Sequence, residues 1–310
     1  YNANVWTESV NWGSIFNTTF EIANGQRLHW KNFFAVNNDK EVREYGGFTQ
    51  KLPAEIYSTK LNYVQRNLFN TQIGGDHIIK IKDINTKFDW TLSLSEANRN
   101  QPNMRDIVYA AQPPFTLQTG TRASILTNTQ SASNFYSTTK DTNRYVAVNY
   151  EIPFTQWAGL QGKFKTGYSA LNRERGFEAE FFHQVPRTGA TNVGLTGSPT
   201  PNPVYPTPPE IVYSPLNRGP RGYYVTEDTR ATDSYNARQK LHAYYGQVDM
   251  PIFSKLRFIG GGRFEDNFQS VKTFNPFDQT SVLLEKYNYK TYLNDFQSSI
   301  VDPSYRKSNV

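Results

Sequence analysis

Arg263 and Glu265 form the pair whose residue types and spacing most clearly allow chemistry in this sequence. They stand two positions apart in an alternating stretch, so on an extended strand both side chains lie on one side, opposite Phe258 and Phe264. A guanidinium and a carboxylate placed together bind a charged substrate, or they bind each other as one rung of an ion-pair ladder. We favour the ladder and keep substrate binding as the alternative.

The other residue types do not combine into a catalytic or metal-binding set. The sequence has no Cys, and its four His (positions 29, 77, 183 and 242) lack the spacing of a metal motif such as HExxH. It contains no GxSxG, no GxxxxGK and no nucleophile with a base at motif spacing. We therefore expect no metal site, no cofactor and no enzymatic activity.

The net charge of +6 points to anionic partners, but the basic residues are spread along the chain without a run of five. A nucleic-acid surface needs a concentrated basic stripe, so we expect no nucleic-acid partner. The phosphates of lipopolysaccharide or an anionic ligand are the alternatives that the sequence leaves open.

Composition favours strands over helices. Aromatic residues make up 15% of the 310 residues, Tyr and Phe above all, and no run of about 18 apolar residues predicts a transmembrane helix. Tyr, Phe, Thr and Val are typical of β-strands. The opening residues, YNANVWTESV, do not have the pattern of a signal peptide.

The segment 87–95 shows the alternation that strands require. Phe88, Trp90, Leu92 and Leu94 fall on one side of an extended chain, and Lys87, Asp89, Thr91, Ser93 and Ser95 fall on the other. Such a strand has one apolar face and one wet face.

Turn signals divide the chain into hairpins. Asn24-Gly25 predicts a tight hairpin turn between strands at 10–23 and 26–36. A second, long hairpin is expected from Arg27 to about Thr49 and from Ile56 to Lys82, with its tip near 51–54. Its arms are about twice the usual five or six residues of globular strands.

Short and long connections then alternate along the chain. Short turns are expected at 83–86, 151–159 and 250–255, and long loops at 99–141 and, rich in Pro, at 183–234. Further strands are expected at 142–151, 159–180, 235–249, 255–271 and around 283–293. Outer-membrane barrels have this alternation of short periplasmic turns and long external loops, so we expect an all-β, antiparallel transmembrane β-barrel. A soluble β-sandwich or propeller is the alternative, and no repeat of 40–50 residues supports a propeller.

Four blocks resemble the outer-membrane TonB-dependent receptor family, in the Bacteroidota type that carries a carboxypeptidase-regulatory-like domain ahead of the plug. The blocks are YVQRNLFNTQIGGDHIIKI (63–81), FDWTLSLSEANRNQPNMRDIVY (88–109), FKTGYSALNRERGFEAEFF (164–182) and YNARQKLHAYYGQVDMPIFSKLRFIGGGRFED (235–266). They carry Gly75-Asp76-His77, an Asp-Trp pair, a Lys-x-Gly strand and the Gly-x-Arg-x-Glu ending of Gly261, Arg263 and Glu265. Together they follow the family order over about residues 10–270.

The resemblance implies residues 1–310 to be part of a receptor barrel in the bacterial outer membrane, the N-terminal part of a larger barrel of about 22 strands. Plug domain and C-terminal strands are expected to lie outside this sequence, and the TonB complex would act through that plug. Lipid, lipopolysaccharide and a surface lipoprotein are the other expected partners. Arg263 and Glu265 would then face the lumen and contact plug or substrate.

Three functions remain open. The first is a receptor importing a scarce solute such as a siderophore, glycan, peptide or cofactor. The second is a receptor-like barrel that serves as a structural or interaction subunit of an outer-membrane complex without transport of its own. The third is a soluble β module that binds sugar or protein.

Overall fold

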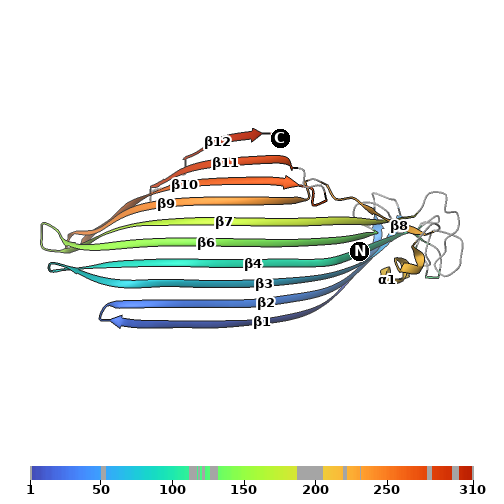
Figure 1. Cartoon of the computed structure of the whole chain (residues 1–310), viewed down its shortest axis with the longest axis horizontal. Helices are drawn as coiled ribbons and strands as arrows, with labels where there is room; N and C mark the ends of the chain where they lie inside the picture. Colours follow the sequence, from blue (N-terminus) through green and yellow to red (C-terminus); the bar gives the residue numbers. More distant parts are fainter. Residues whose placement is uncertain are drawn as a thin grey trace.

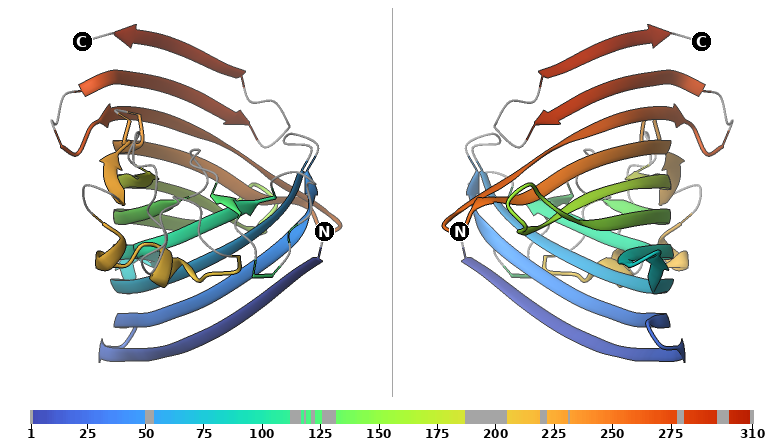
Figure 2. Two further views of the ribbon diagram at one scale, coloured as in Figure 1. Left: turned by 90° about the vertical axis from the view of Figure 1, so that its right-hand side faces the viewer. Right: turned by 90° about the vertical axis from the view of Figure 1, so that its left-hand side faces the viewer.

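The structure is a computed structural model that describes residues 2–49, 54–111, 117, 119–120, 123–125, 132–186, 205–218, 222–230, 232–277, 281–294 and 300–308. In this part the chain is all-β and forms one large antiparallel meander sheet of very long strands (Figure 1). Seen along the strands, the sheet is curved and twisted (Figure 2). The expected all-β, antiparallel class is therefore confirmed.

The strands run in chain order. They are β1 (Asn2–Ala23), β2 (Gln26–Thr49), β3 (Ala54–Ile81), β4 (Ile84–Ala110), β5 (Ser124–Ile125), β6 (Ser133–Thr155), β7 (Gln161–Pro186), β8 (Tyr223–Glu227), β9 (Ser234–Phe253), β10 (Leu256–Phe274), β11 (Ser281–Asn294) and β12 (Ile300–Ser308). Neighbours in the sheet follow the order β1-β2-β3-β4-β6-β7-β9-β10-β11-β12, while the short β5 pairs with β4 and β8 with β7. Within the described residues β1 pairs only with β2 and β12 only with β11, so the sheet is not closed into a barrel.

Short turns join the strands at one end of the sheet. The predicted Asn24-Gly25 turn is confirmed: Gly25 has a φ of 74°, which favours glycine, and its carbonyl accepts a hydrogen bond from the amide of Ile78 at 2.8 Å. The turn after β9 falls within its predicted segment, and the turns after β3 and β6 overlap theirs. The predicted tip of the second hairpin lies outside the described residues except for Ala54, where β3 begins.

The predicted long loops were partly wrong. Residues 99–110 and 133–141 continue β4 and β6, so much of the loop expected at 99–141 is strand. The loop expected at 183–234 likewise yields the end of β7 and all of β8. These parts carry apolar residues such as Ile107 and Tyr109 but no sustained alternation of apolar and polar residues. Cross-strand hydrogen bonds extend the sheet where alternation gives no signal.

The register defines two faces of the sheet. Side chains paired across antiparallel strands lie on one face, and Trp30, Ile73, Leu92 and Val146 are paired in one row across four strands. We call their face the apolar face. The residues between them in each strand, such as Asp89 and Asn149, point to the other face, which we call the polar face.

A small core lies at the end of the sheet away from the short turns. Ile107 and Tyr109 of β4 pack there against Val212 and Tyr213, which belong to or follow the helix α1 (Pro209–Val212). The 3₁₀ helix η1 (Pro215–Asn217) follows. Among the described residues, these helical turns fall far short of the length and hydropathy of a membrane-crossing helix.

Candidate functional site on the polar face

The polar face carries a chain of charged and hydrogen-bonding side chains in its half near the short turns. They come from β4, β6, β7, β9 and β10, and the register pairs them in rows across the sheet. The set consists of Lys87, Asp89, Asn149, Glu151, Lys163, Lys165, Tyr245, Asp249, Arg257, Arg263 and Glu265.

Arg263 and Glu265 lie together on this face. Arg263 Nε donates to Glu265 Oε1 at 2.5 Å, and both side chains are partly exposed. The two residues satisfy each other's charge, as in the ladder interpretation of the sequence.

Two further ion-pair groups flank this pair. Glu151 accepts from Lys165 Nζ at 2.9 Å, and Lys87 Nζ lies 3.9 Å from its other oxygen. Asp249, whose side chain is 9% exposed, accepts two bonds of 2.5 Å from the guanidinium of Arg257. Paired charges of this kind fix the positions of side chains on neighbouring strands and do not transfer protons. We call this half of the polar face the supporting wall.

A glycine of β7 makes room for a hydrogen-bond chain that joins side chains of β4, β6 and β9. Tyr245 Oη donates to Asn149 Oδ1 at 2.9 Å, and Asn149 Nδ2 donates to Asp89 Oδ2 at 2.7 Å. Gly167 lies between Tyr245 and Asn149 in the register, and a Cβ there would clash with both side chains. The hydrogen-bond chain thus requires glycine at position 167, which strand alternation did not single out.

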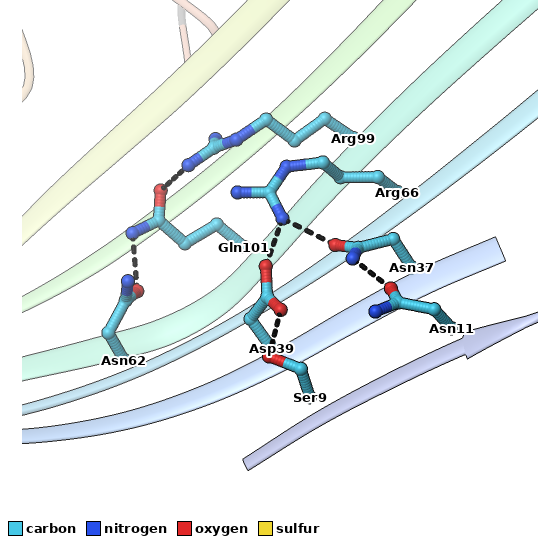
Figure 3. Close-up of polar contacts among 8 residues, drawn as sticks. All are labelled: Ser9, Asn11, Asn37, Asp39, Asn62, Arg66, Arg99 and Gln101. Atoms are coloured by element: carbon cyan, nitrogen blue, oxygen red, sulfur yellow. Dashed lines mark hydrogen bonds and ion pairs between the residues drawn. The ribbon is translucent and has the colours of Figure 1, made fainter. Parts of the chain in front are cut away.

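A second polar cluster lies on the other half of the face (Figure 3). Ser9 Oγ donates to Asp39 Oδ1 at 2.7 Å, while Arg66 pairs with Asp39 and donates to Asn37 Oδ1 at 2.7 Å. Asn37 in turn donates to Asn11. The hydrogen bond from Ser9 and the guanidinium of Arg66 hold the pKa of Asp39 below its usual range.

Arg99 differs from its neighbours because it has no carboxylate partner among the described residues. It donates to Gln101 Oε1 at 2.7 Å, and Gln101 donates to Asn62 (Figure 3). It also donates to Ser137 Oγ at 3.1 Å. The register places it directly opposite Arg66. Burial, and to a lesser extent the charge of Arg66, lowers the pKa of Arg99.

An unpaired guanidinium beside a second one attracts anionic or strongly accepting groups. Arg99 is therefore the strongest substrate-contact candidate on the polar face. The sequence did not reveal it, because the segment from residue 99 onward was expected to be a loop.

Compared with protein-family models, curated proteins and solved structures, the chain gives no match. The interpretation of the site thus depends on its geometry alone.

The His residues do not converge on one site. Within the described residues no group of three or more His, Cys, Asp or Glu could hold a metal ion. Each His has its own neighbour: His29 lies 3.9 Å from Asp76, His77 Nε2 accepts from Trp90 Nε1, His183 lies 3.4 Å from Asp228, and His242 bonds Tyr168 Oη.

Proposed function

We propose that this chain is part of a transmembrane β-barrel in the bacterial outer membrane, the N-terminal part of a larger receptor barrel of about 22 strands. The proposed function is that of a TonB-dependent receptor that imports a scarce solute. The observation that carries the proposal is a band of exposed apolar side chains that gather on the apolar face, in the half of the sheet near the short turns.

The band has exposed apolar members on each long strand from β1 to β10. In its central row Ile73 is 46% exposed, Leu92 47% and Val146 38%. Its other exposed members include Trp12, Phe16, Phe20, Trp30, Phe69, Phe164, Tyr244 and Phe258. A water-soluble protein rarely leaves so many large apolar side chains of one face uncovered, whereas the hydrocarbon of a bilayer would cover them favourably.

The height of the band suits a bilayer. In β1 its members Trp12, Phe16 and Phe20 span nine residues, which is about 30 Å at 3.3 Å per residue. Tilted by about 40°, as barrel strands are, this gives about 23 Å, close to the apolar band of about 25 Å of outer-membrane barrels.

Beyond the band the same face becomes charged. Arg238 pairs with Glu174 at 3.2 Å, and Arg144 lies 4.0 Å from the other oxygen of that carboxylate. Charged residues at a bilayer midplane are costly, so this half of the strands belongs in water. Long strands that rise above the membrane on the side opposite the short turns explain both halves of the sheet.

Import is the function that this arrangement supports best. The polar face would line the lumen, where the guanidiniums of Arg66 and Arg99 lie in the outer half. In this proposal the TonB complex acts on a plug inside the closed barrel, lipopolysaccharide surrounds the outer half of the wall, and a surface lipoprotein delivers solute.

A structural role is the second candidate, favoured by one observation. Arg263 with Glu265 and Arg257 with Asp249 are mutually satisfied, so neither pair offers a free charge to a solute. The chain would then serve an outer-membrane complex without transport of its own.

The membrane location is tested by extraction of native membranes. We expect the full-length protein to resist carbonate extraction and to require detergent for a monodisperse state. Purification as a monodisperse protein without detergent contradicts the barrel and favours a soluble β module.

Import is then tested by uptake in the native organism. Arg99→Gln is expected to reduce growth on the scarce nutrient at unchanged protein level, and Lys87→Gln in the supporting wall is the matched control. A deletion that damages the envelope but leaves uptake unchanged favours the structural role.

A further inference from the structure

A hollow of about 230 Å³ lies on the polar face, in the half away from the short turns. Its lining includes Arg173 and Arg175 of β7, Tyr235 and Gln239 of β9 and Gln269 of β10, and the register places all five on this face. None of the residues of the supporting wall or of the second polar cluster lines it. The hollow is therefore a separate site on the face that would line the lumen.

A buried carboxylate fixes the two guanidiniums of the hollow. Asp141 lies eight residues from Asn149 in β6, so it points to the same polar face, and its side chain is only 6% exposed. It accepts a hydrogen bond of 2.5 Å from Arg173 Nη2 and one of 2.8 Å from Arg175 Nε. Both guanidiniums are therefore oriented before any solute arrives, so less side-chain entropy is lost when one binds.

The two guanidiniums keep donors that this carboxylate does not use. Arg175 bonds Asp141 only through Nε, and Arg173 bonds it only through Nε and Nη2. Both terminal nitrogens of Arg175 and Nη1 of Arg173 have no acceptor among the described residues. The side chains of Arg173 and Arg175 are 41% and 42% exposed, so a solute in the hollow can reach them.

The charge of the hollow is positive. The described residues that line it include no Asp or Glu, and the single charge of Asp141 balances only one of the two guanidiniums. Arg238 also lines the hollow, but it pairs with Glu174 at 3.2 Å, and the register points both of these side chains to the apolar face. One positive charge thus remains in excess on the polar face, carried by groups that only donate hydrogen bonds.

An oxyanion is the ligand that such groups select. A guanidinium offers no acceptor, so it repels cations and gives no partner to a group that must donate. A carboxylate or phosphate accepts two parallel hydrogen bonds from a guanidinium and cancels the excess charge. The amide of Gln269, two strands away on β10, provides a further donor. The volume suits one such group with a few neighbouring atoms rather than a whole large solute.

We propose that the hollow over Arg173 and Arg175 binds a carboxylate or phosphate group of the solute that the receptor imports. The assignment of an anionic solute rests on the proposed import function, whereas the anion site itself does not.

Arg99 lies close enough to serve a second anionic group of the same solute. Asp141 is paired with Ala97 on one side and with Arg175 on the other, and Arg99 follows Ala97 by two residues in β4. Two strand spacings across the sheet and two residues along it separate the Cα atoms of Arg99 and Arg175 by about 12 Å. The probes of the site therefore include one with three carboxylates.

The test measures binding to the full-length protein in a neutral maltoside detergent, in Tris buffer without phosphate or carboxylate. The anionic probes are succinate, tricarballylate and glycerol 3-phosphate, observed by saturation-transfer NMR, and succinamide is the neutral probe with the shape of succinate. We expect at least one anion to bind and succinamide not to bind. Binding of the carboxylates alone assigns a carboxylate solute, binding of glycerol 3-phosphate alone assigns a phosphate, and binding of both supports the shared oxyanion chemistry.

Variants connect the binding to the two guanidiniums. Arg175→Gln leaves Arg173 paired with Asp141 and should weaken anion binding about tenfold, and Arg173→Gln is a second, independent variant with the same expected loss. Arg144→Gln is the matched control, because Arg144 and Arg238 also flank one carboxylate, that of Glu174, but point to the apolar face. It should bind anions as the original protein does. Circular dichroism verifies that each variant is folded.

Absence of binding by every anion overturns the proposal, as does equal binding of succinamide. Unchanged binding by both Arg175→Gln and Arg173→Gln, or an equal loss in Arg144→Gln, also overturns it. Failure of the import function is a different result: a protein that binds anions in detergent but whose deletion leaves uptake unchanged keeps the anion site and loses only the assignment of an imported solute.

Discussion

Leu92 gives the sharpest test of the proposed bilayer contact. It lies at the centre of the band, between Ile73 and Val146 in the register, and its side chain is 47% exposed. Leu92→Lys puts a charge where the proposal requires lipid.

The expected cost separates a membrane from water. A Lys at the bilayer midplane of a barrel costs about 2–4 kcal/mol. On a water-exposed strand the same substitution of a half-exposed residue changes stability by only about 0.5 kcal/mol. The neighbouring Thr91 points to the polar face, so Thr91→Lys should cost no more than about 0.5 kcal/mol in either environment.

The assay is reversible urea unfolding of the full-length protein folded into short-chain phosphatidylcholine vesicles, followed by tryptophan fluorescence. The free energy of unfolding should fall by about 2–4 kcal/mol for Leu92→Lys and remain nearly unchanged for Thr91→Lys. Equal, small effects of both substitutions would refute the bilayer contact. A large effect of Thr91→Lys alone would mean that the two faces are assigned the wrong way round.

Three further substitutions test other parts of the structure. Gly167→Leu should displace the ring of Tyr245 and cost about 1–3 kcal/mol in the same urea titration, whereas an unchanged midpoint would contradict the close contact. Tyr109→Phe removes the hydrogen bond of 2.6 Å to the carbonyl of Thr207, worth about 0.5–1.5 kcal/mol, so amide exchange in 205–218 should become faster. Burial raises the pKa of Asp106, so the native state binds this proton more tightly than the unfolded chain and stability rises as pH falls through that pKa. Asp106→Asn should flatten this dependence between pH 7 and pH 4, and a pH profile that remains unchanged would contradict it.

The half of the sheet near the short turns could be predicted from the sequence. Phe88, Trp90, Leu92 and Leu94 alternate with polar residues, and the structure has them in β4 with the expected period. The Asn24-Gly25 turn was found because its backbone geometry has a specific residue signal.

The half of the sheet away from the short turns could not be predicted in this way. Residues 99–110 and 133–141 are strand, but polar residues fall on both faces over most of their length and an irregularity between Gln101 and Met104 breaks the period. They therefore lack the regular contrast that reveals a strand. Their stability comes from ladder hydrogen bonds and cross-strand contacts such as that of Arg99 with Ser137, which only the register defines.

Site residues could be predicted only where their relative position follows from spacing within one strand. Arg263 and Glu265 lie two apart in β10, and the expected common side follows from that spacing. The hollow over Arg173 and Arg175 joins β7 to the later strands β9 and β10, and no local pattern predicts such a site.

The order of strands in the sheet has a consequence for how such a chain can change. Apart from the short β5 and β8, each strand pairs with its neighbours along the chain, so a hairpin and its tight turn form a self-contained unit. Duplication or loss of one such unit adds or removes two strands, and the following strand still begins at the same end of the sheet. The side chains of the other strands then stay on the same face of the sheet, and the long loops stay at the same end. The width of the sheet can therefore change by whole hairpins without altering the remaining strands.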